Sequence, residues 1–430
     1  MIALWFRRDL RVEDCSLLAH AQGAVLPLFI FDSNILDPLP QDDRRVAFVR
    51  NAVAKLKADL KAIGLNLAVF EGDPVAVFTQ LKTQGVTQIL AAPDYDGYAR
   101  SRDQKVGEIL PLRLINDCYL FDPDEVQTQS GGFYRVFTPF YNKTIELLTP
   151  GHTDERLRPN TLKLAEWNYG PDLPFTVAQN PLDRLEKIVP HYTEQRDFPA
   201  LEATGHLSTA LRFGTVGIRQ AAQRLKTLQN KGIKIAPYWR QLIWREFWAQ
   251  LLYHHPHSER ADLYPLNLKW NEPGEAFARW QAGQTGFPLI DAAMRQLLQT
   301  GQMHNRARMV TAGFLAKDLL VHWRHGEAHF ARHLMDYDAA QNVGNWQWAA
   351  GCGADAQPFV RIFNPWLQSK RYDSAGEYIR RWVPELAGVS HAALHDPARL
   401  GREKPAAYPA PIVNHAEAAK IAQIRFKERK

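Results

Sequence analysis

The chain has few cysteines and no long uncharged apolar segment. Its 430 residues include three cysteines, Cys15, Cys118 and Cys352, which are odd in number and far apart. Such a set predicts neither a disulfide framework nor a metal knuckle, and three thiols cannot hold a four-thiolate iron–sulfur cluster. No segment approaches the roughly 18 apolar residues of a membrane span, and the first residues lack the charge order of a signal peptide. We therefore expect a protein of the reducing cytoplasm, without membrane association and without a metal site.

The sequence also lacks the bias of a disordered chain, and neither sign of charge dominates it. Hydrophobic residues make up 46% of the chain and charged residues 23%, as in soluble globular proteins, and the length predicts two or three domains. The excess of 52 Lys and Arg over 46 Asp and Glu is mild evidence for a polyanionic partner such as nucleic acid. Aromatic residues are abundant instead, with 12 Trp, 14 Tyr and 21 Phe. Ten of the 12 tryptophans follow residue 230.

The first part of the chain alternates short apolar segments with helical patterns. Strands are predicted where the apolar segments are short and bounded by Gly, Pro, Asp or Asn, at residues 2–6, 24–31, 65–70, 88–92 and 112–121. Apolar residues at helical spacing predict helices over 44–63 and 74–83. This order implies a doubly wound parallel sheet, a Rossmann-like α/β domain over residues 1–126, whose carboxyl edge usually binds a nucleotide-like ligand. No G-x-G-x-x-G follows the first strand, so the standard dinucleotide fingerprint is absent.

The remainder is predicted to be a connector followed by an all-α domain. Over residues 127–190 the periodicity fades and Pro, Gly, Thr and Asn accumulate, which is typical of an inter-domain linker. Over residues 191–430 nearly every pattern is helical, at 218–228, 239–254, 288–300, 305–323 and 327–334. This second domain holds the aromatic excess.

Residues 336–348 concentrate polar groups. Two acids, four amides and two tryptophans fall within these thirteen residues. Such a density is costly in a core unless a ligand satisfies the polar groups, so the segment favours a polar cofactor. Upstream, Trp244 and Trp248 lie one helical turn apart beside Arg245. That second pattern alone fits a core helix with solvated charges equally well.

These segments resemble the photolyase/cryptochrome flavoproteins. The matching strings are residues 5–11, 137–140, 196–199, 242–247, 280–288, 303–306, 336–348 and 361–365. The pattern is most like that of the class I photolyases, which repair cyclobutane pyrimidine dimers. The resemblance implies an antenna domain, a linker and an all-α C-terminal domain that binds FAD and DNA. It also implies a light-dependent carbon–carbon lyase that acts on UV-damaged DNA irrespective of sequence, and we expect a monomer.

The resemblance assigns the FAD contacts. They are Tyr192, Arg245, Asp336, Asp338 and the turn formed by Thr204, Gly205, His206, Leu207 and Ser208. Carboxylates suit the ribose and the flavin edge because they accept from hydroxyl and N–H groups, and the hydroxyls and backbone N–H groups of the turn suit the pyrophosphate. Asn342 falls where the family faces flavin N5, where an amide can accept from a protonated nitrogen and so favours reduced flavin.

Three further tryptophans match the family's electron relay. Trp270, Trp323 and Trp346 correspond to the chain that reduces photoexcited flavin by passing an electron inward from the surface. Indole is easily oxidised and stays stacked inside a protein, so a spaced series can act as a wire. Core packing would explain any one of them taken singly.

The same resemblance assigns the substrate contacts. Trp244 and Trp348 match the two indoles that enclose the flipped-out dimer, and photolyases are among the enzymes that flip their target bases. Gln241 and Met309 would contact the dimer, and the surrounding DNA would meet Arg196, Asn305, Arg306, Arg361 and Gln368. Phosphate contacts of this kind position DNA without reading its sequence. Solvated surface is an equally good explanation for Arg361.

The sequence departs from the family pattern at two of these sites. Class I enzymes carry a glutamate at the position of Gln241, and an amide cannot share a proton with the dimer radical anion, which predicts slower repair. Glutamine there is similar to (6-4) photolyases and animal cryptochromes. Asn305 and Met309 replace the catalytic histidines of the (6-4) enzymes, which disfavours (6-4) repair. The phosphate turn has Gly205 and His206 where Ser and Arg are usual. We expect weaker FAD retention unless His206 is protonated or another group substitutes.

The second chromophore and the biological role have alternatives. Folate-type members carry an acid at the position of Ala99, and residues 98–103 look more like members that use a deazaflavin or FMN, so we favour these over folate; an empty site is the other possibility. The alternative role is a blue-light cryptochrome of the same fold. Only about 40 residues follow Leu386, whereas signalling members often add a long tail, which favours repair. A dark redox flavoenzyme lacks support because no nicotinamide fingerprint is present.

Overall fold

The computed structural model describes residues 1–355 and 361–428, which divide into two units. Unit 1 comprises residues 1–134, 138–190 and 205–256. Unit 2 comprises residues 135–137, 191–204 and the described residues from 257 onward. The domain boundaries expected after residues 126 and 190 remain predictions.

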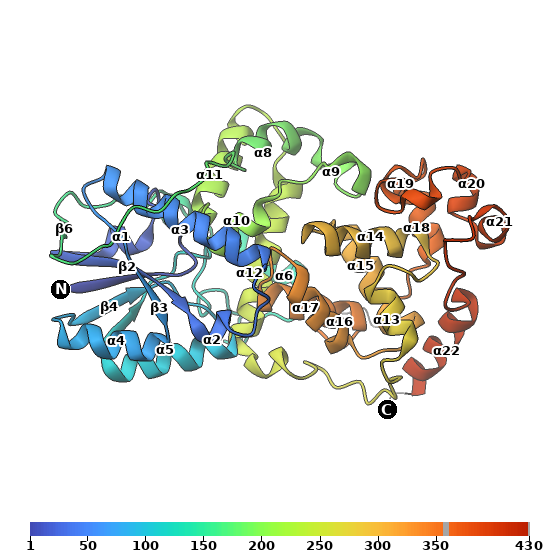
Figure 1. Ribbon diagram of the computed structural model, residues 1–430, viewed down its shortest axis with the longest axis horizontal. Coiled ribbons are helices and arrows are strands. Elements are labelled where there is room, and N and C mark those ends of the chain that lie inside the picture. Colours follow the sequence, from blue (N-terminus) through green and yellow to red (C-terminus); the bar gives the residue numbers. More distant parts are fainter. Residues whose placement is uncertain (356–360, 429–430) are drawn as a thin grey trace. The chain divides into compact units, whose positions relative to one another are not determined.

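Unit 1 contains a parallel sheet, which confirms the predicted α/β fold (Figure 1). The strand order is β3-β2-β1-β4-β5, with β6 paired to the start of β2. The strands are β1 Ile2–Phe6, β2 Ala24–Asp32, β3 Ala68–Gly72, β4 Gln88–Ala91, β5 Leu112–Leu114 and β6 Lys163–Leu164. Successive side chains of a strand point to opposite faces, so Leu4 and Phe6 enter one core and Ala3 and Trp5 the other.

Helices cover both faces of this sheet. Figure 1 shows α1 (Ser16–His20) and α3 (Arg44–Ala62) on one face and α4 (Pro74–Thr83) and α5 (Gly97–Ile109) on the other. The short α2 (Ser33–Leu36) follows β2 directly. Asp43, Asp73 and Asp96 cap α3, α4 and α5 by accepting from backbone N–H groups of the first turn, and each such cap is worth about 1 kcal/mol.

Two segments of unit 1 differ from their predicted structure. The strand expected over 112–121 ends at Leu114, because the N–H groups of Leu120 and Phe121 donate to the Glu246 carboxylate instead of a neighbouring strand. The expected irregular connector carries helices, namely α6 (Phe137–Leu147), α7 (Pro150–Thr153) and α8 (Asp183–Ile188). Three further helices complete unit 1: α10 (Leu207–Phe213), α11 (Ile218–Asn230) and α12 (Ala236–His254).

Unit 2 is helical in its described residues, as predicted for this part of the chain. Its helices are α9 Tyr192–Gln195, α13 Glu275–Gln281, α14 Pro288–Thr300, α15 Asn305–Gly313, α16 Trp323–His333, α17 Ala339–Ala350, α18 Pro365–Tyr372, α19 Glu377–Trp382, α20 His391–Leu394, α21 Pro397–Glu403 and α22 His415–Glu428. Short 3₁₀ turns occupy Val189–His191, Pro199–Leu201, Pro256–Glu259 and Pro384–Leu386. None of the helices in the described part of the chain has the length and apolar character to cross a membrane.

The helix expected over 305–323 is interrupted. After α15 the chain forms a π-helical turn at Phe314–Asp318, and Leu320 adopts a positive φ of 51°. His322 then caps α16 by accepting from the N–H of Arg324. The reversal lets α16 return against α17, and the two helices approach so closely that a Cβ at Gly326 would overlap the ring of Trp346.

Candidate functional site

The polar segment 336–348 leads into α17. Asp338 is 5% exposed and caps this helix by accepting from the N–H of Gln341 at 3.2 Å. Asp336 lies two residues earlier, with its carboxylate oxygens 2.9 and 3.1 Å from Nη2 of Arg308. Arg308 belongs to α15 and was not singled out in the sequence. Both predicted FAD ligands are therefore held in place, one by a helix start and one by an ion pair.

Asn342 lies in the first turn of α17 and is oriented by Glu327 of α16. Its Nδ2 donates to the Glu327 carbonyl oxygen at 3.2 Å and to Glu327 Oε1 at 2.9 Å. A backbone carbonyl can only accept, so the amide NH₂ must face Glu327. In the described part of the chain no group donates to Asn342 Oδ1, which leaves that oxygen available to accept a hydrogen bond. Burial raises the pKa of Glu327, and the hydrogen bond from Asn342 opposes that shift.

The three predicted relay tryptophans all belong to unit 2. Trp346 is 2% exposed, and its ring centroid lies 4.9 Å from that of Phe330. Trp323 begins α16, is fully buried and donates from Nε1 to Asp262 at 2.6 Å. Trp270 is half-buried. Two of the three indoles, Trp346 and Trp323, are therefore buried, and Trp270 is partly exposed.

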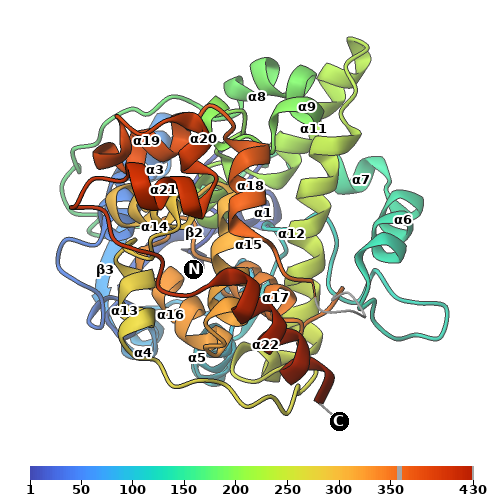
Figure 2. The same ribbon diagram turned by 90° about the vertical axis from the view of Figure 1, so that its right-hand side faces the viewer.

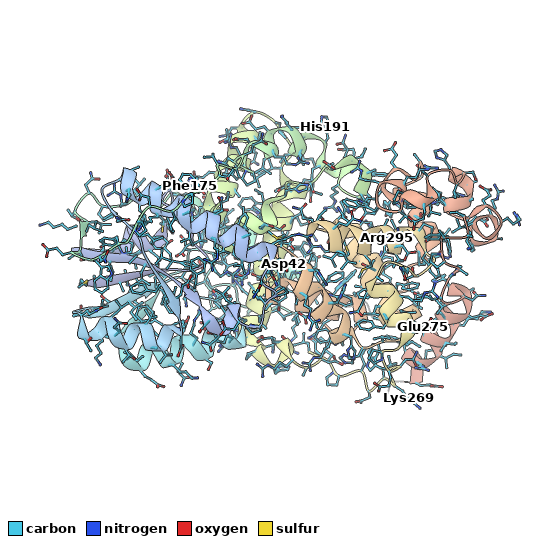
Figure 3. All side chains as sticks on the ribbon, viewed as in Figure 1. Asp42, Phe175, His191, Lys269, Glu275 and Arg295 are labelled. Atoms are coloured by element: carbon cyan, nitrogen blue, oxygen red, sulfur yellow. The ribbon has the colours of Figure 1, made fainter. Side chains whose placement is uncertain are left out.

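A histidine and the C-terminal helix contact the outer end of this series. The His322 ring lies 5.7 Å from Trp323 and 5.2 Å from Trp270. Phe426 of α22 packs 6.3 Å from Trp270, and Arg425 Nη1 donates to the Lys269 carbonyl at 2.8 Å. Figure 2 shows α22 beside the end of α17, and Figure 3 labels Lys269 near the last turn of α22. The last helix of the chain therefore covers part of Trp270.

The residues of the predicted phosphate turn differ from one another in burial. Of its five predicted FAD contacts, Thr204 belongs to unit 2 and the other four to unit 1. Gly205 and Leu207 are buried, whereas His206 and Ser208 are exposed. His206 has a φ of 52° and stands at the start of α10. A Cβ on Gly205 would overlap the hydroxyl oxygen of Tyr238, which explains why this position holds glycine.

Arg245 projects from α12 and is fastened to the backbone of unit 1. Its Nη1 donates to the Cys118 carbonyl at 2.5 Å and its Nη2 to the Leu211 carbonyl at 3.2 Å. The guanidinium also lies 4.4 Å from the centre of the Tyr119 ring. These contacts fix the position of a permanent positive charge on α12.

The predicted dimer contacts Gln241 and Trp244 also lie on α12. Gln241 is half-buried and its Nε2 donates to the Pro237 carbonyl, one turn earlier, at 3.3 Å. The half-buried Trp244 ring stacks on the buried Trp248 at 5.5 Å with planes 24° apart. Trp248 thus holds the plane of Trp244 without itself being accessible.

Unit 2 carries the remaining predicted substrate contacts, and the structure pairs several of them. Arg306 bonds Asp197 at 2.8 Å and lies 4.3 Å over the Tyr372 ring. Arg196 lies 5.7 Å over Tyr192, whose pKa is raised by burial. Arg306 is therefore a positioned cation rather than a free surface one, and its two partners were not predicted from the sequence.

The other predicted contacts of unit 2 differ in exposure. Asn305 is exposed and its amide lies 3.6 Å from the sulfur of the half-buried Met309. Arg361 is exposed and stacks over Phe363 at 5.1 Å. Trp348 is half-buried against the core of unit 2. Gln368 has a buried Oε1 to which none of the described residues donates, so this oxygen is suited to accept from a ligand.

The segment expected to bind a second chromophore lies at the carboxyl end of β2. Tyr98 Oη donates to Asp32 Oδ2 at 2.6 Å, and Asp32 also accepts from Asn34. Burial raises the pKa of Tyr98, and the hydrogen bond to Asp32 raises it further. Ala99 is buried, with its N–H bound to Asp96. The identity of a second chromophore remains a prediction.

The residues present fit a flavin nucleotide. Unit 2 offers an available amide oxygen at Asn342 together with the fixed carboxylates of Asp336 and Asp338. Unit 1 offers hydroxyl groups at a glycine turn and the guanidinium of Arg245. Acceptors suit the N–H and hydroxyl groups of such a ligand, and donors suit its phosphates.

Comparisons with known proteins agree with this chemistry. Residues 2–159 match the family model described as DNA photolyase, and residues 238–428 match that of the FAD binding domain of DNA photolyase. A deoxyribodipyrimidine photo-lyase of Vibrio cholerae is 36% identical, and the alignment covers 100% of both chains.

Two solved structures share the fold over almost the whole chain. An archaeal photolyase from Sulfolobus tokodaii with two FAD molecules is 31% identical, with a TM-score of 0.85 and coverage of 99% of this chain and 100% of that one. A cryptochrome from Synechocystis sp. PCC6803 is 25% identical, with a TM-score of 0.87 and coverage of 99% of both chains.

Proposed function

The chain belongs to the DNA photolyase family, and from this premise we propose that it is a light-dependent enzyme that splits cyclobutane pyrimidine dimers in UV-damaged DNA, in the manner of class I photolyases. The observation that carries the proposal is the orientation of Asn342 by Glu327, which presents an acceptor to a protonated flavin nitrogen. When bound, reduced FAD would supply an electron to the dimer under blue light and take it back after the ring has split, so the reaction has no net redox change.

The protein's own groups hold the cofactor and keep it reduced. Asp336, Asp338 and Asn342 bind the flavin and ribose side, and Arg245 with the turn at Gly205 binds the phosphate side. Trp346, Trp323 and Trp270 pass an electron inward when the flavin must be reduced. The exposure of Trp270 supports that direction, because of these three indoles it alone is open enough to receive an electron from solution.

The substrate groups provide flat walls and phosphate contacts. Trp244 and Trp348 stack on the flipped dimer, with Met309 and Gln241 at its edge. Arg196, Arg306 and Arg361, with Asn305 and Gln368, contact the DNA around it. The stacked support of Trp248 beneath Trp244 favours this role, since a preset ring plane lowers the cost of ordering it on binding.

A repair assay tests the proposal directly. Purified, photoreduced protein is irradiated with blue light in the presence of an oligonucleotide containing one thymine dimer, and the intact lesion is quantified against a dark sample. We expect light-dependent loss of the lesion. Trp244→Ala should weaken lesion binding by about 1–3 kcal/mol, roughly five- to 150-fold. Trp167→Ala removes an equally half-buried tryptophan of unit 1 outside α12 and should leave binding unchanged.

The same assay separates the alternatives. Unchanged dimer content in protein that binds FAD and is photoreduced would contradict the repair proposal and favour a blue-light receptor, which the cryptochrome neighbour and Gln241 also favour. An oligonucleotide with a (6-4) photoproduct should stay unrepaired, because Asn305 and Met309 cannot deliver a proton.

A second chromophore of the deazaflavin or FMN type is part of the proposal. The Sulfolobus neighbour with two FAD molecules supports a flavin-like ligand in this family. An absorption spectrum of the extracted chromophores would identify it, and a folate spectrum would contradict the expectation. The monomeric state and the cytoplasmic location remain predictions.

A further inference from the structure

We propose that the Tyr238 hydroxyl replaces the hydroxyl missing from the phosphate turn and binds the FAD pyrophosphate directly. The inference rests on the proposed function in taking FAD as the ligand. It answers the departure at Gly205, where the family pattern has a serine. All the groups that carry it belong to unit 1.

The geometry places the tyrosine oxygen where a serine side chain would begin. A Cβ built on Gly205 would overlap Tyr238 Oη, and it would lie 3.0 Å from Cζ and 3.3 Å from Leu185 Cδ2. Tyr238 lies in the first turn of α12 and is 6% exposed, so its ring is held by the surrounding packing. Gly205 and Tyr238 therefore form a coupled pair. Gly205 lacks the side chain that a serine would have, and the Tyr238 hydroxyl from α12 occupies that space, a substitution that we call the coupled exchange.

The chemistry of the two hydroxyls is equivalent toward a phosphate. A phenol has a pKa near 10, so at neutral pH it keeps its proton and can donate to an anionic oxygen. Hydrogen bonds to charged acceptors are about twice as strong as neutral ones. A buried ring with two χ angles also loses little freedom when the ligand binds, so more of the hydrogen-bond energy appears as affinity.

His206 does not take over this role. Its side chain is exposed and its backbone is left-handed, with φ 52°. It can supply a positive charge to the turn when protonated, in place of the usual arginine, but it carries no hydroxyl.

Removing that one oxygen tests the proposal. Tyr238→Phe keeps the ring and removes only the oxygen. Its dissociation constant for FAD, measured by flavin fluorescence after removal and readdition of the cofactor, should rise about tenfold, in line with the roughly 1.5–3 kcal/mol of a hydrogen bond to a charged group. Riboflavin, which has no pyrophosphate, should bind both proteins equally. Tyr253→Phe removes a hydroxyl elsewhere on α12 and should change neither affinity.

The results that overturn the inference are distinct. Equal FAD affinity of wild type and Tyr238→Phe would remove it, and so would an equal loss of FAD and riboflavin binding, since that would mark a packing role. Failure of the wild type to bind FAD at all would instead contradict the proposed function.

A reciprocal exchange gives a second, independent test. Gly205→Ser alone should lose FAD affinity, because its Cβ meets the Tyr238 hydroxyl. Combining Gly205→Ser with Tyr238→Leu makes room and returns a hydroxyl to the turn, so affinity should recover toward the wild-type value. A double variant that binds FAD no better than the weaker single variant would contradict the coupled exchange.

Discussion

Two regions of the chain follow the family pattern to different degrees. One is the α16–α17 pair in unit 2, and the other is the phosphate turn with α12 in unit 1. The α16–α17 pair keeps every expected group, including Asn342 and Trp346, and its helices meet at Gly326 with no room for a larger residue. The turn and α12 carry Gly205, His206 and Gln241 in place of the usual residues. We interpret this as a difference in tolerance of substitution. A predicted contact to the flavin ring needs one residue type in one place, whereas a phosphate can accept a hydrogen bond from a donor on any neighbouring element.

The strongest test of this contrast removes one indole from the α16–α17 pair. Trp346→Phe preserves a flat ring but one that is far harder to oxidise, so flavin photoreduction should slow by about a hundredfold or more, equivalent to about 3 kcal/mol in the barrier. The measurement is the rate of flavin bleaching under blue light with an added reductant.

Trp280→Phe is the matched control for that variant. Trp280 is fully buried and its ring lies 6.2 Å from Trp346, but it has no place in the predicted relay. Photoreduction as slow as in Trp346→Phe would show that the relay has been assigned to the wrong residues, and an unchanged rate in Trp346→Phe would remove the relay altogether.

The second test concerns the stability of α12. Burial raises the pKa of Glu246 from its ordinary value of 4.5 to about 7, and the backbone N–H groups of Leu120 and Phe121 oppose that shift. Between about pH 4.5 and 7 the native protein therefore binds more protons than the unfolded chain. The contribution of Glu246 to the free energy of unfolding is fully present below about pH 4.5, falls as pH rises through this window and is constant above it.

We expect this loss to amount to about 3 kcal/mol and to disappear in Glu246→Gln. Denaturant unfolding of both proteins from pH 4.5 to 8 provides the measurement, with the difference between them as the readout. A difference that stays constant with pH would show that Glu246 ionises normally in the folded protein.

The third test releases Asn342. Glu327→Leu removes the carboxylate acceptor of the Asn342 amide, so the amide can rotate and present NH₂ where an acceptor is needed. Loss of one hydrogen bond of about 1 kcal/mol predicts roughly fivefold faster dark reoxidation of the bound flavin in air. Glu327→Gln keeps an acceptor and should behave like the wild type. Equal rates in all three proteins would exclude a positioning role for Glu327.

The smallest effect is expected at the departure in α12. Gln241→Glu restores the acid that the family pattern carries beside the dimer, and dimer splitting per absorbed photon should rise about twofold to threefold. FAD affinity should not change. A lower splitting yield in Gln241→Glu would indicate that glutamine suits the substrate of this protein better than glutamate does.

Much of the architecture follows from local patterns. Short apolar segments bounded by Gly, Pro, Asp or Asn predicted the sheet, and helical spacing predicted α12, α14 and most of α15 and α16. The misses have specific causes. The last predicted strand is cut short because Glu246, far along the chain, takes the N–H groups of Leu120 and Phe121. The break between α15 and α16 depends on a left-handed Leu320, for which the sequence has no glycine as a sign.

The sequence by itself determined which residue types are present and which face of each element is apolar, and with the family resemblance it named Asn342, the relay tryptophans and the phosphate turn. Only the tertiary structure decided which side chains meet: Glu327 with Asn342, Tyr238 with Gly205, and Phe426 with Trp270. The physical reason is that periodicity encodes burial, which depends on near neighbours, whereas each of these pairs joins separate elements. Their contacts are set by the approach of packed elements, and that approach depends on the whole core.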